Sequence, residues 1–146
     1  ISQGDIVAAL SKTCRLAGEA HPGLTVEFRP KVQELVFETD LAAVAECVDE
    51  MIHNSFKAGA KQVEVYVAIR GKDVSIRIAD NGPGIPPALR GTRLFEADPR
   101  KSSTGTGLGL SNVKETFEAL GGKIRLATSG NGRTEFVIHL PFSRKM

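Results

Sequence analysis

The stretch that constrains the fold most strongly is a strand pattern that ends in a carboxylate and runs into turn residues. Val74, Ile76 and Ile78 alternate with polar or small residues, which indicates a half-buried strand. Asp80 continues the inward parity of these side chains, although carboxylates are almost never fully buried without a partner. Residues 81–84, Asn-Gly-Pro-Gly, then allow the backbone to turn sharply and to approach a ligand closely.

Two interpretations of Asp80 are open on this stretch alone. In the first, the carboxylate is simply solvated in a hairpin turn. In the second, its missing partner is a nucleotide base, whose amino group donates a hydrogen bond to Asp80.

Composition indicates one ordinary soluble globular domain. The chain has 146 residues, of which 41% are hydrophobic and 25% charged, so we expect a single domain over residues 1–146. Its net charge of +2 is too small to indicate binding to nucleic acid or to membrane lipid. Cys14 and Cys47 have no metal-ligand spacing, and we interpret them as buried free thiols in a reducing, cytoplasmic compartment.

The sequence has no apolar run close to the ~18 residues that a membrane span needs. Because the chain begins at Ile1 rather than Met, we expect it to be part of a longer parent protein. That parent has room for a membrane anchor upstream, but we expect no direct membrane contact from this part.

A strong helix pattern covers residues 41–58, with Asp40 as its predicted N-cap. Its inward side is apolar or small, at Leu41, Val44, Ala45, Val48, Met51, Ile52, Ser55 and Phe56. Its opposite side carries Glu46, Glu50, Asn54 and Lys57. One interpretation is a solvated charged face. The other is a set of oxygen ligands for a hard cation, with an ammonium for the phosphates that the cation neutralises.

The remaining pattern before Asp80 predicts one helix, two short strands and a hairpin. We expect the helix over residues 5–20, with Ile6, Ala9, Leu10, Thr13, Leu16 and Ala17 on its buried face. Short strands are predicted near residues 24–28 and 35–37. An alternating strand over residues 63–69 turns at residues 71–73 into the strand that ends at Asp80.

A long polar connection follows, and connections of this length in compact domains are usually functional lids or disordered. We expect a lid over about residues 86–104, rich in proline, arginine and serine or threonine, with the apolar pair Leu94 and Phe95 attaching its middle to the body. It ends at Gly105, where the sequence Gly-Thr-Gly-Leu-Gly-Leu opens a helix. That helix buries Leu110, Val113, Phe117 and Leu120 and ends at residues 121–122, both glycine.

Glycines at the start of a helix expose backbone amides at the positive end of the helix dipole, which favours phosphate binding. A polar lid rather than a strand precedes them, so a dinucleotide-binding Rossmann motif is excluded, and the P-loop sequence is absent.

The chain closes with a second hairpin, whose turn lies at Asn131 and Gly132. Thr134 shares the inward parity of the last strand, so its hydroxyl needs a partner, either backbone or a group in the base pocket. His139 faces the other way, and His21 and His53 have no nucleophile or metal ligand at a useful spacing.

Four ordered stretches resemble one known superfamily. They are residues 50–60 (EMIHNSFKAGA), 80–85 (DNGPGI), 94–101 (LFEADPRK) and 105–113 (GTGLGLSNV). Each is weak alone, but their order is similar to that of the Bergerat-fold (GHKL) ATPases, which include sensor histidine kinases, type II topoisomerases, mismatch-repair ATPases and heat-shock chaperones. The likeness covers about residues 40–141 and is strongest to the catalytic and ATP-binding domain of histidine kinases.

The resemblance implies an α+β fold, a two-layer sandwich whose mixed sheet is covered on one face by helices. It also implies ATP and Mg²⁺ as ligands. By position, Asn54 would hold the magnesium together with Glu50, Lys57 would reach a phosphate, and Asp80 would accept from the adenine amino group. The other nucleotide-binding residues would be Gly82, Gly84, Ile85, Lys101, Gly105, Thr106, Gly107, Leu108, Gly109, Leu110 and Thr134.

Glu50 departs from the pattern of many histidine kinases, in which Asn stands four residues before the magnesium-binding Asn. A Glu there is the general base of the hydrolytic members, whereas Lys57 is the kinase-like choice. We therefore expect Glu50 to be the catalytic base of a histidine kinase domain. The alternatives are a hydrolytic ATPase and a serine kinase of the anti-sigma type.

The resemblance also implies partners. None of the three histidines lies in the acid-flanked helix that presents the phosphoacceptor in this family. We therefore expect a histidine-bearing dimerisation domain of the same parent protein as substrate, and a response regulator downstream.

Overall fold

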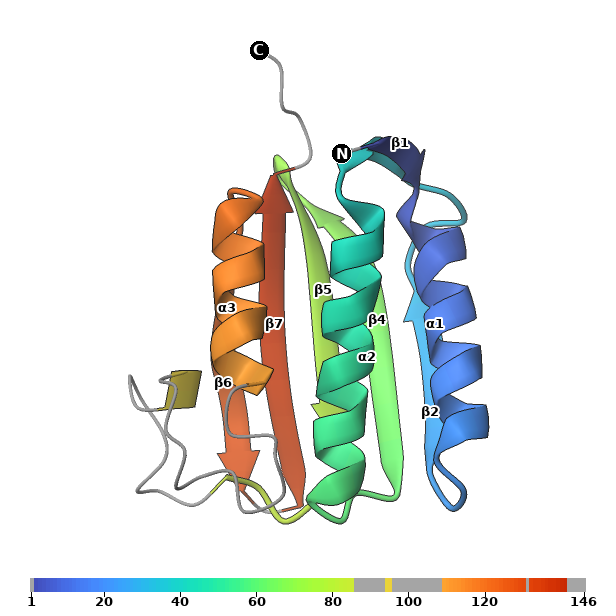
Figure 1. Ribbon diagram of the computed structural model, residues 1–146, viewed down its shortest axis with the longest axis vertical. Coiled ribbons are helices and arrows are strands. Elements are labelled where there is room, and N and C mark those ends of the chain that lie inside the picture. Colours follow the sequence, from blue (N-terminus) through green and yellow to red (C-terminus); the bar gives the residue numbers. More distant parts are fainter. Residues whose placement is uncertain (1, 86–93, 96–108, 131, 142–146) are drawn as a thin grey trace.

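The computed structural model describes residues 2–85, 94–95, 109–130 and 132–141. Within these residues, three helices lie side by side on one face of a five-stranded sheet (Figure 1). The elements follow the order β1 (Ser2–Asp5), α1 (Ile6–Ala20), β2 (Thr25–Pro30), β3 (Val36–Thr39), α2 (Leu41–Lys57), β4 (Gln62–Arg70), β5 (Asp73–Asp80), α3 (Gly109–Ala119), β6 (Lys123–Gly130) and β7 (Arg133–Pro141). The predicted two-layer α+β architecture is confirmed.

The main sheet is mixed and has the strand order β2-β4-β5-β7-β6. Both predicted hairpins, β4–β5 and β6–β7, are present as antiparallel pairs, whereas β2 pairs with β4 in parallel. The strand β5 lies at the centre, between β4 and β7, so its last residue, Asp80, is opposite Val63 on one side and Thr134 on the other. The central position of β5 places the predicted carboxylate in the middle of one end of the sheet.

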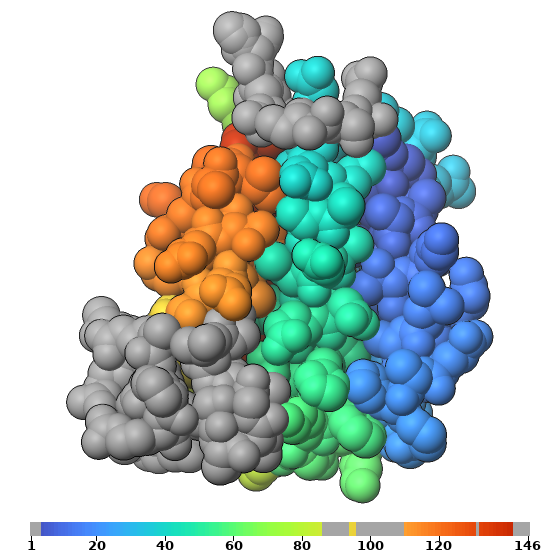
Figure 2. Space-filling view, viewed as in Figure 1, coloured from blue at the N-terminus to red at the C-terminus, as the bar shows by residue number. Residues whose placement is uncertain are grey.

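The helix α2 packs against the middle of the sheet, between α1 and α3 (Figure 2). Its apolar side is fully buried at Val44, Val48 and Ile52. The predicted N-cap is confirmed, because the Asp40 carboxylate accepts a hydrogen bond of 3.1 Å from the Ala43 amide. The cap fixes where α2 begins and the buried face fixes how it packs, so together they determine the position of its last turn.

The N-terminal part differs from the sequence expectation in two ways. The face of α1 that packs on the body is rotated toward Val7 and Cys14, and the side chain of Leu16, predicted to be buried, is 45% exposed. The strand β1 was not predicted; it pairs with β3 in a separate two-stranded sheet. Asp5 caps α1 and also accepts a hydrogen bond from the Leu35 amide, which links the two parts.

The helix α3 ends as the paired glycines predict. Gly121 has φ +85°, and the Gly122 amide donates a hydrogen bond of 2.7 Å to the Phe117 carbonyl. A Cβ at Gly122 would lie 2.3 Å from the His139 carbonyl oxygen, so only glycine fits where the chain passes β7. Phe117 itself is fully buried in the core.

Leu94 and Phe95 attach to the body, as their apolar character predicts. Leu94 is buried, and the Phe95 ring meets the Phe136 ring edge-on, with their centroids 6.2 Å apart. The rest of the predicted lid, residues 86–93 and 96–104, lies outside the described residues.

Within the described residues, no helix combines the length and the apolar character that crossing a lipid bilayer requires.

Removing the α2 cap should lower stability without touching the site. We expect Asp40→Ala to reduce the free energy of unfolding by about 1 kcal/mol, because the Ala43 amide loses its acceptor. Urea denaturation measures the change. Asp49→Ala, at an exposed position of the same helix, is the matched control and should leave the midpoint nearly unchanged; equal midpoints for both variants would contradict the capping role.

Candidate functional site

The predicted site residues gather at one end of the molecule, shown at the bottom of Figure 1. The C-terminal ends of α2 and β5 meet there with the beginnings of α3 and β7. Helix α2 contributes polar side chains from its last two turns, and β5 contributes Asp80. This arrangement brings together positions from opposite parts of the sequence.

The carboxylate of Asp80 is held by two different elements. Its Oδ2 accepts a hydrogen bond of 2.6 Å from the Ser55 hydroxyl on α2. Its Oδ1 accepts a hydrogen bond of 2.9 Å from the Gly82 amide in the loop that follows β5. Asp80 is only partly buried, and an ionised carboxylate has about four acceptor positions, so it retains capacity for a further donor.

The loop after Asp80 is fastened on both sides. Asn81 Oδ1 accepts hydrogen bonds of 2.8 and 2.9 Å from the Lys61 and Gln62 amides. At its other end, the Ile85 amide donates a hydrogen bond of 2.7 Å to the Ser129 hydroxyl of β6. The loop therefore joins the turn after α2 to the closing hairpin.

Gly84 is required by this path. It has φ +93°, and a Cβ would lie 2.9 Å from the Gly130 amide nitrogen and 3.2 Å from Ser129 Oγ. Gly82 is also confined, since a Cβ there would lie 3.1 Å from Asp80 Oδ1. Both glycines thus let backbone pass close to other groups, as the turn sequence predicts.

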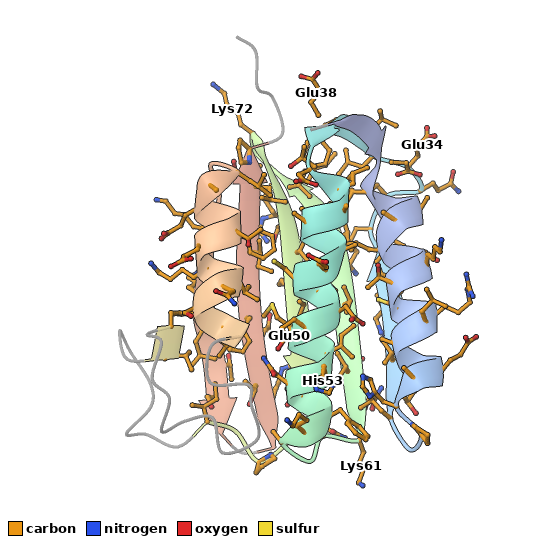
Figure 3. The ribbon with its side chains drawn as sticks, in the orientation of Figure 1. Glu34, Glu38, Glu50, His53, Lys61 and Lys72 are labelled. Atoms are coloured by element: carbon orange, nitrogen blue, oxygen red, sulfur yellow. The ribbon has the colours of Figure 1, made fainter. Side chains whose placement is uncertain are left out.

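The polar side of α2 includes a buried oxygen without a partner. Among the described residues, Asn54 Oδ1 is the one buried side-chain polar atom that accepts no hydrogen bond. Glu50, one turn earlier, is partly buried, and Lys57, in the last turn, is exposed. Figure 3 shows Glu50 and His53 on the lower half of α2, with Lys61 beyond its C-terminal end.

An orphaned amide oxygen one helical turn from the Glu50 carboxylate fits a hard cation, which prefers oxygen ligands. Within the described part of the chain, no group of three or more His, Cys, Asp or Glu side chains forms a metal cluster. Mg²⁺ that is bound together with phosphates usually takes one or two side-chain ligands and keeps several waters, so Asn54 and Glu50 fit such an ion without a larger cluster.

Thr134 lies beside Asp80 on the same face of the sheet, because residues directly opposite one another in an antiparallel pair share a face. It is buried, with 5% exposure. Gly109 is the first residue of α3, and Leu110 follows it with a partly buried side chain. The predicted residues Lys101, Gly105, Thr106, Gly107 and Leu108 lie outside the described residues.

Both cysteines are buried free thiols, as predicted. Burial raises the pKa of Cys14 to about 12. Burial also raises the pKa of Cys47, with smaller contributions from Glu46 and Glu50, while a hydrogen bond with Thr116 opposes the shift. Thiols in this state stay protonated near neutral pH, so neither is suited to nucleophilic or metal chemistry.

His21 and His53, which sequence spacing left apart, lie together where α1 ends beside α2. Their ring centroids are 5.1 Å apart, and the His21 ring also stacks on Phe56 at 4.6 Å. These contacts are aromatic packing between helices. They lie on the α1 side of α2.

Sequence reasoning missed two residues of the site. Ser55 was interpreted only as a small inward residue, yet it donates to Asp80. Ser129 carries no local signal, and its contact with the Ile85 amide crosses 44 residues of chain. A signal for Ser55 existed, because a hydroxyl on the buried side of a helix needs a partner.

Comparisons with known proteins point to one family. The family model described as "Histidine kinase-, DNA gyrase B-, and HSP90-like ATPase" matches residues 39–144. The sensor protein CitS of Bacillus subtilis (strain 168) is 30% identical over 129 residues, which cover 86% of this chain but only 24% of CitS. The chain therefore spans about a quarter of the length of that curated relative.

Solved structures share the fold. The catalytic domain of histidine kinase ThkA superimposes with a TM-score of 0.85 at 19% identity, covering 98% of each chain. The ATP-binding domain of PrrB from Mycobacterium tuberculosis has a TM-score of 0.81 at 28% identity, covering 97% of each chain. The chain belongs to the family of histidine kinase-, DNA gyrase B- and HSP90-like ATPases.

Proposed function

We propose that this chain is the ATP-binding catalytic domain of a sensor histidine kinase. In this proposal the domain transfers the γ-phosphoryl group of ATP to a histidine on a separate dimerisation domain of the same parent protein. A response regulator then receives the phosphoryl group from that histidine. The observation that carries the proposal is the pairing, on adjacent residues of α2, of an unpartnered amide oxygen with a hydroxyl that holds Asp80.

The base end of the nucleotide is assigned to Asp80. A carboxylate whose two oxygens already accept from Ser55 and Gly82 keeps lone pairs for the adenine amino group. Gly82, Gly84 and Ile85 form the adjoining wall, since their backbone passes close to Asp80 and to the closing hairpin. Thr134, opposite Asp80 in the sheet, completes this side.

The phosphate end is assigned to the other side of α2. Asn54 Oδ1 and the Glu50 carboxylate would hold Mg²⁺, which supplies neutralisation of the charge on the phosphate oxygens. Lys57 brings an ammonium to the same end of α2. The backbone amides at the start of α3, which begins at Gly109, lie at the positive end of that helix's dipole, which favours binding of a phosphate. The glycine-rich residues 105–108 precede that start.

The chemistry asks mainly for position and charge compensation, because phosphoryl transfer needs little covalent help from the protein. Glu50 is assigned as general base. Its carboxylate would accept the N–H proton of the incoming imidazole as the opposite ring nitrogen attacks the phosphorus. A hydrolytic ATPase is the second candidate, favoured by this same carboxylate, which would then accept a proton from water.

The histidine kinase and the hydrolytic ATPase differ in the group that accepts the phosphoryl group, so identifying the acceptor distinguishes them. We expect labelled ATP, mixed with the chain and a histidine-bearing helical partner, to give acid-labile label on the partner. Glu50→Gln should slow this transfer about 10²–10⁴-fold at saturating ATP and Mg²⁺. Free phosphate without partner label would favour the ATPase, and acid-stable label a serine kinase. Glu46→Gln, at an exposed position of the same helix, is the control.

Asn54 should determine the dependence of binding on magnesium. We expect Asn54→Ala to weaken ATP binding about 10–100-fold in Mg²⁺ but hardly at all in EDTA, since only the cation loses a ligand. Calorimetric titrations in both conditions test this. An equal loss with and without Mg²⁺ would show that Asn54 acts on the nucleotide or on the fold instead.

Asp80 should determine adenine affinity. We expect Asp80→Asn to weaken ATP and ADP binding at least about tenfold, because an amide cannot satisfy Ser55, Gly82 and the base amino group together. Asp73→Asn, at the other end of the same strand, provides the comparison and should bind normally. Unchanged affinity in Asp80→Asn would remove the basis for the base assignment.

A further inference from the structure

The hydrogen bond between Ser55 and Asp80 is more than ordinary packing of a small side chain. Ser55 is 8% exposed, and its hydroxyl lies 2.6 Å from Asp80 Oδ2. An ionised carboxylate can only accept, so the hydroxyl is the donor. The distance is typical of a hydrogen bond strengthened by charge.

The contact restrains the carboxylate from a second direction. Oδ1 is held by the amide of Gly82, which belongs to the same loop as Asp80, whereas Oδ2 is held from a helix on the other layer. With each oxygen tied to a different element, rotation about the Cβ–Cγ bond would break one of the two hydrogen bonds. The plane of the carboxylate is thereby set before any ligand arrives.

We propose that Ser55 is a positioning residue for base selection, acting through Asp80; this rests on the proposed function. An ionised carboxylate presents only acceptor positions, and the hydrogen bonds from Ser55 and Gly82 fix the direction in which Asp80 presents them to the pocket. A purine with a 6-amino group can donate to these positions. A purine with a 6-oxo group brings an oxygen against them and meets repulsion.

The expected result follows from the two purines. The wild-type chain should bind ATP more tightly than inosine triphosphate, which differs in carrying a 6-oxo group. Ser55→Ala should weaken ATP about tenfold while changing inosine triphosphate less than about twofold, because only ATP uses the oriented acceptor. The ratio of the two affinities should therefore fall toward one.

The experiment is a set of calorimetric titrations with both nucleotides in Mg²⁺. Ser75→Ala is the matched control, because Ser75 is also a buried serine but lies on β5 with the opposite parity to Asp80. It should leave the affinity ratio unchanged. Ser55→Cys keeps nearly the same volume with a weaker donor, and it should lower the ratio in the same direction even if Ser55→Ala unfolds.

The outcomes separate this inference from the proposed function. An equal loss of affinity for both nucleotides in the Ser55 variants would overturn base selection and leave a general structural role. A wild-type chain that binds both nucleotides equally would also overturn it, while ATP binding would stand. Wild-type protein that is folded and binds neither nucleotide would refute the proposed function itself.

Discussion

The packing of α2 against the central strands is the constraint on which the rest of the structure depends. Val44, Val48 and Ile52 on α2 are fully buried. Strand residues beneath the helices, such as Val65 and Ile76, are equally buried. Close-packed interiors of this kind resist displacement, so the last turn of α2 has one position relative to the end of β5. The hydrogen bond from Ser55 to Asp80 follows from that register.

The face of the sheet opposite the helices carries a network of charged side chains. Glu135 is 8% exposed, and it accepts from both Arg77 and Arg133 at 2.9 and 3.1 Å. The Arg77 guanidinium also lies over the Tyr66 ring, 4.4 Å from its centroid, and Tyr66 donates a hydrogen bond to Glu64. The two arginine side chains are partly exposed, so their stems cover this face of the sheet while their charged groups reach both Glu135 and water.

Local patterns predicted those elements whose signals lie within a few residues. Helix α2 and its Asp40 cap, both hairpins and the glycine end of α3 are confirmed because alternation, capping and turn chemistry are local. The parallel pairing of β2 with β4 and the four-residue strand β1 were missed. Both depend on partners distant in sequence, which periodicity does not encode.

The same distinction applies to the candidate site. Asp80 was predicted as a site residue because its inward parity conflicts with its charge, and Asn54 because its helical face gathers oxygen ligands for a cation. Leu16 was wrongly placed inside because the apolar face of α1 admits two rotations, and tertiary contacts chose the one with Val7 and Cys14. Ser129 could not be found, since its role exists only after the closing hairpin meets the loop at Ile85.

Asn54 and Ser55 are neighbours in sequence, and successive residues on a helix project about 100° apart. Under the proposed function, one side chain serves the phosphate end of the ligand and the other the base end. A single rigid turn then reads both extremities of the nucleotide, so the two affinities cannot be adjusted separately by moving α2. By thermodynamic reciprocity, whatever displaces that turn loosens the whole ligand, and the bound ligand in return opposes the displacement. Under the proposed function, a displacement of α2 that is imposed from elsewhere in a parent protein would thus be coupled in free energy to nucleotide binding.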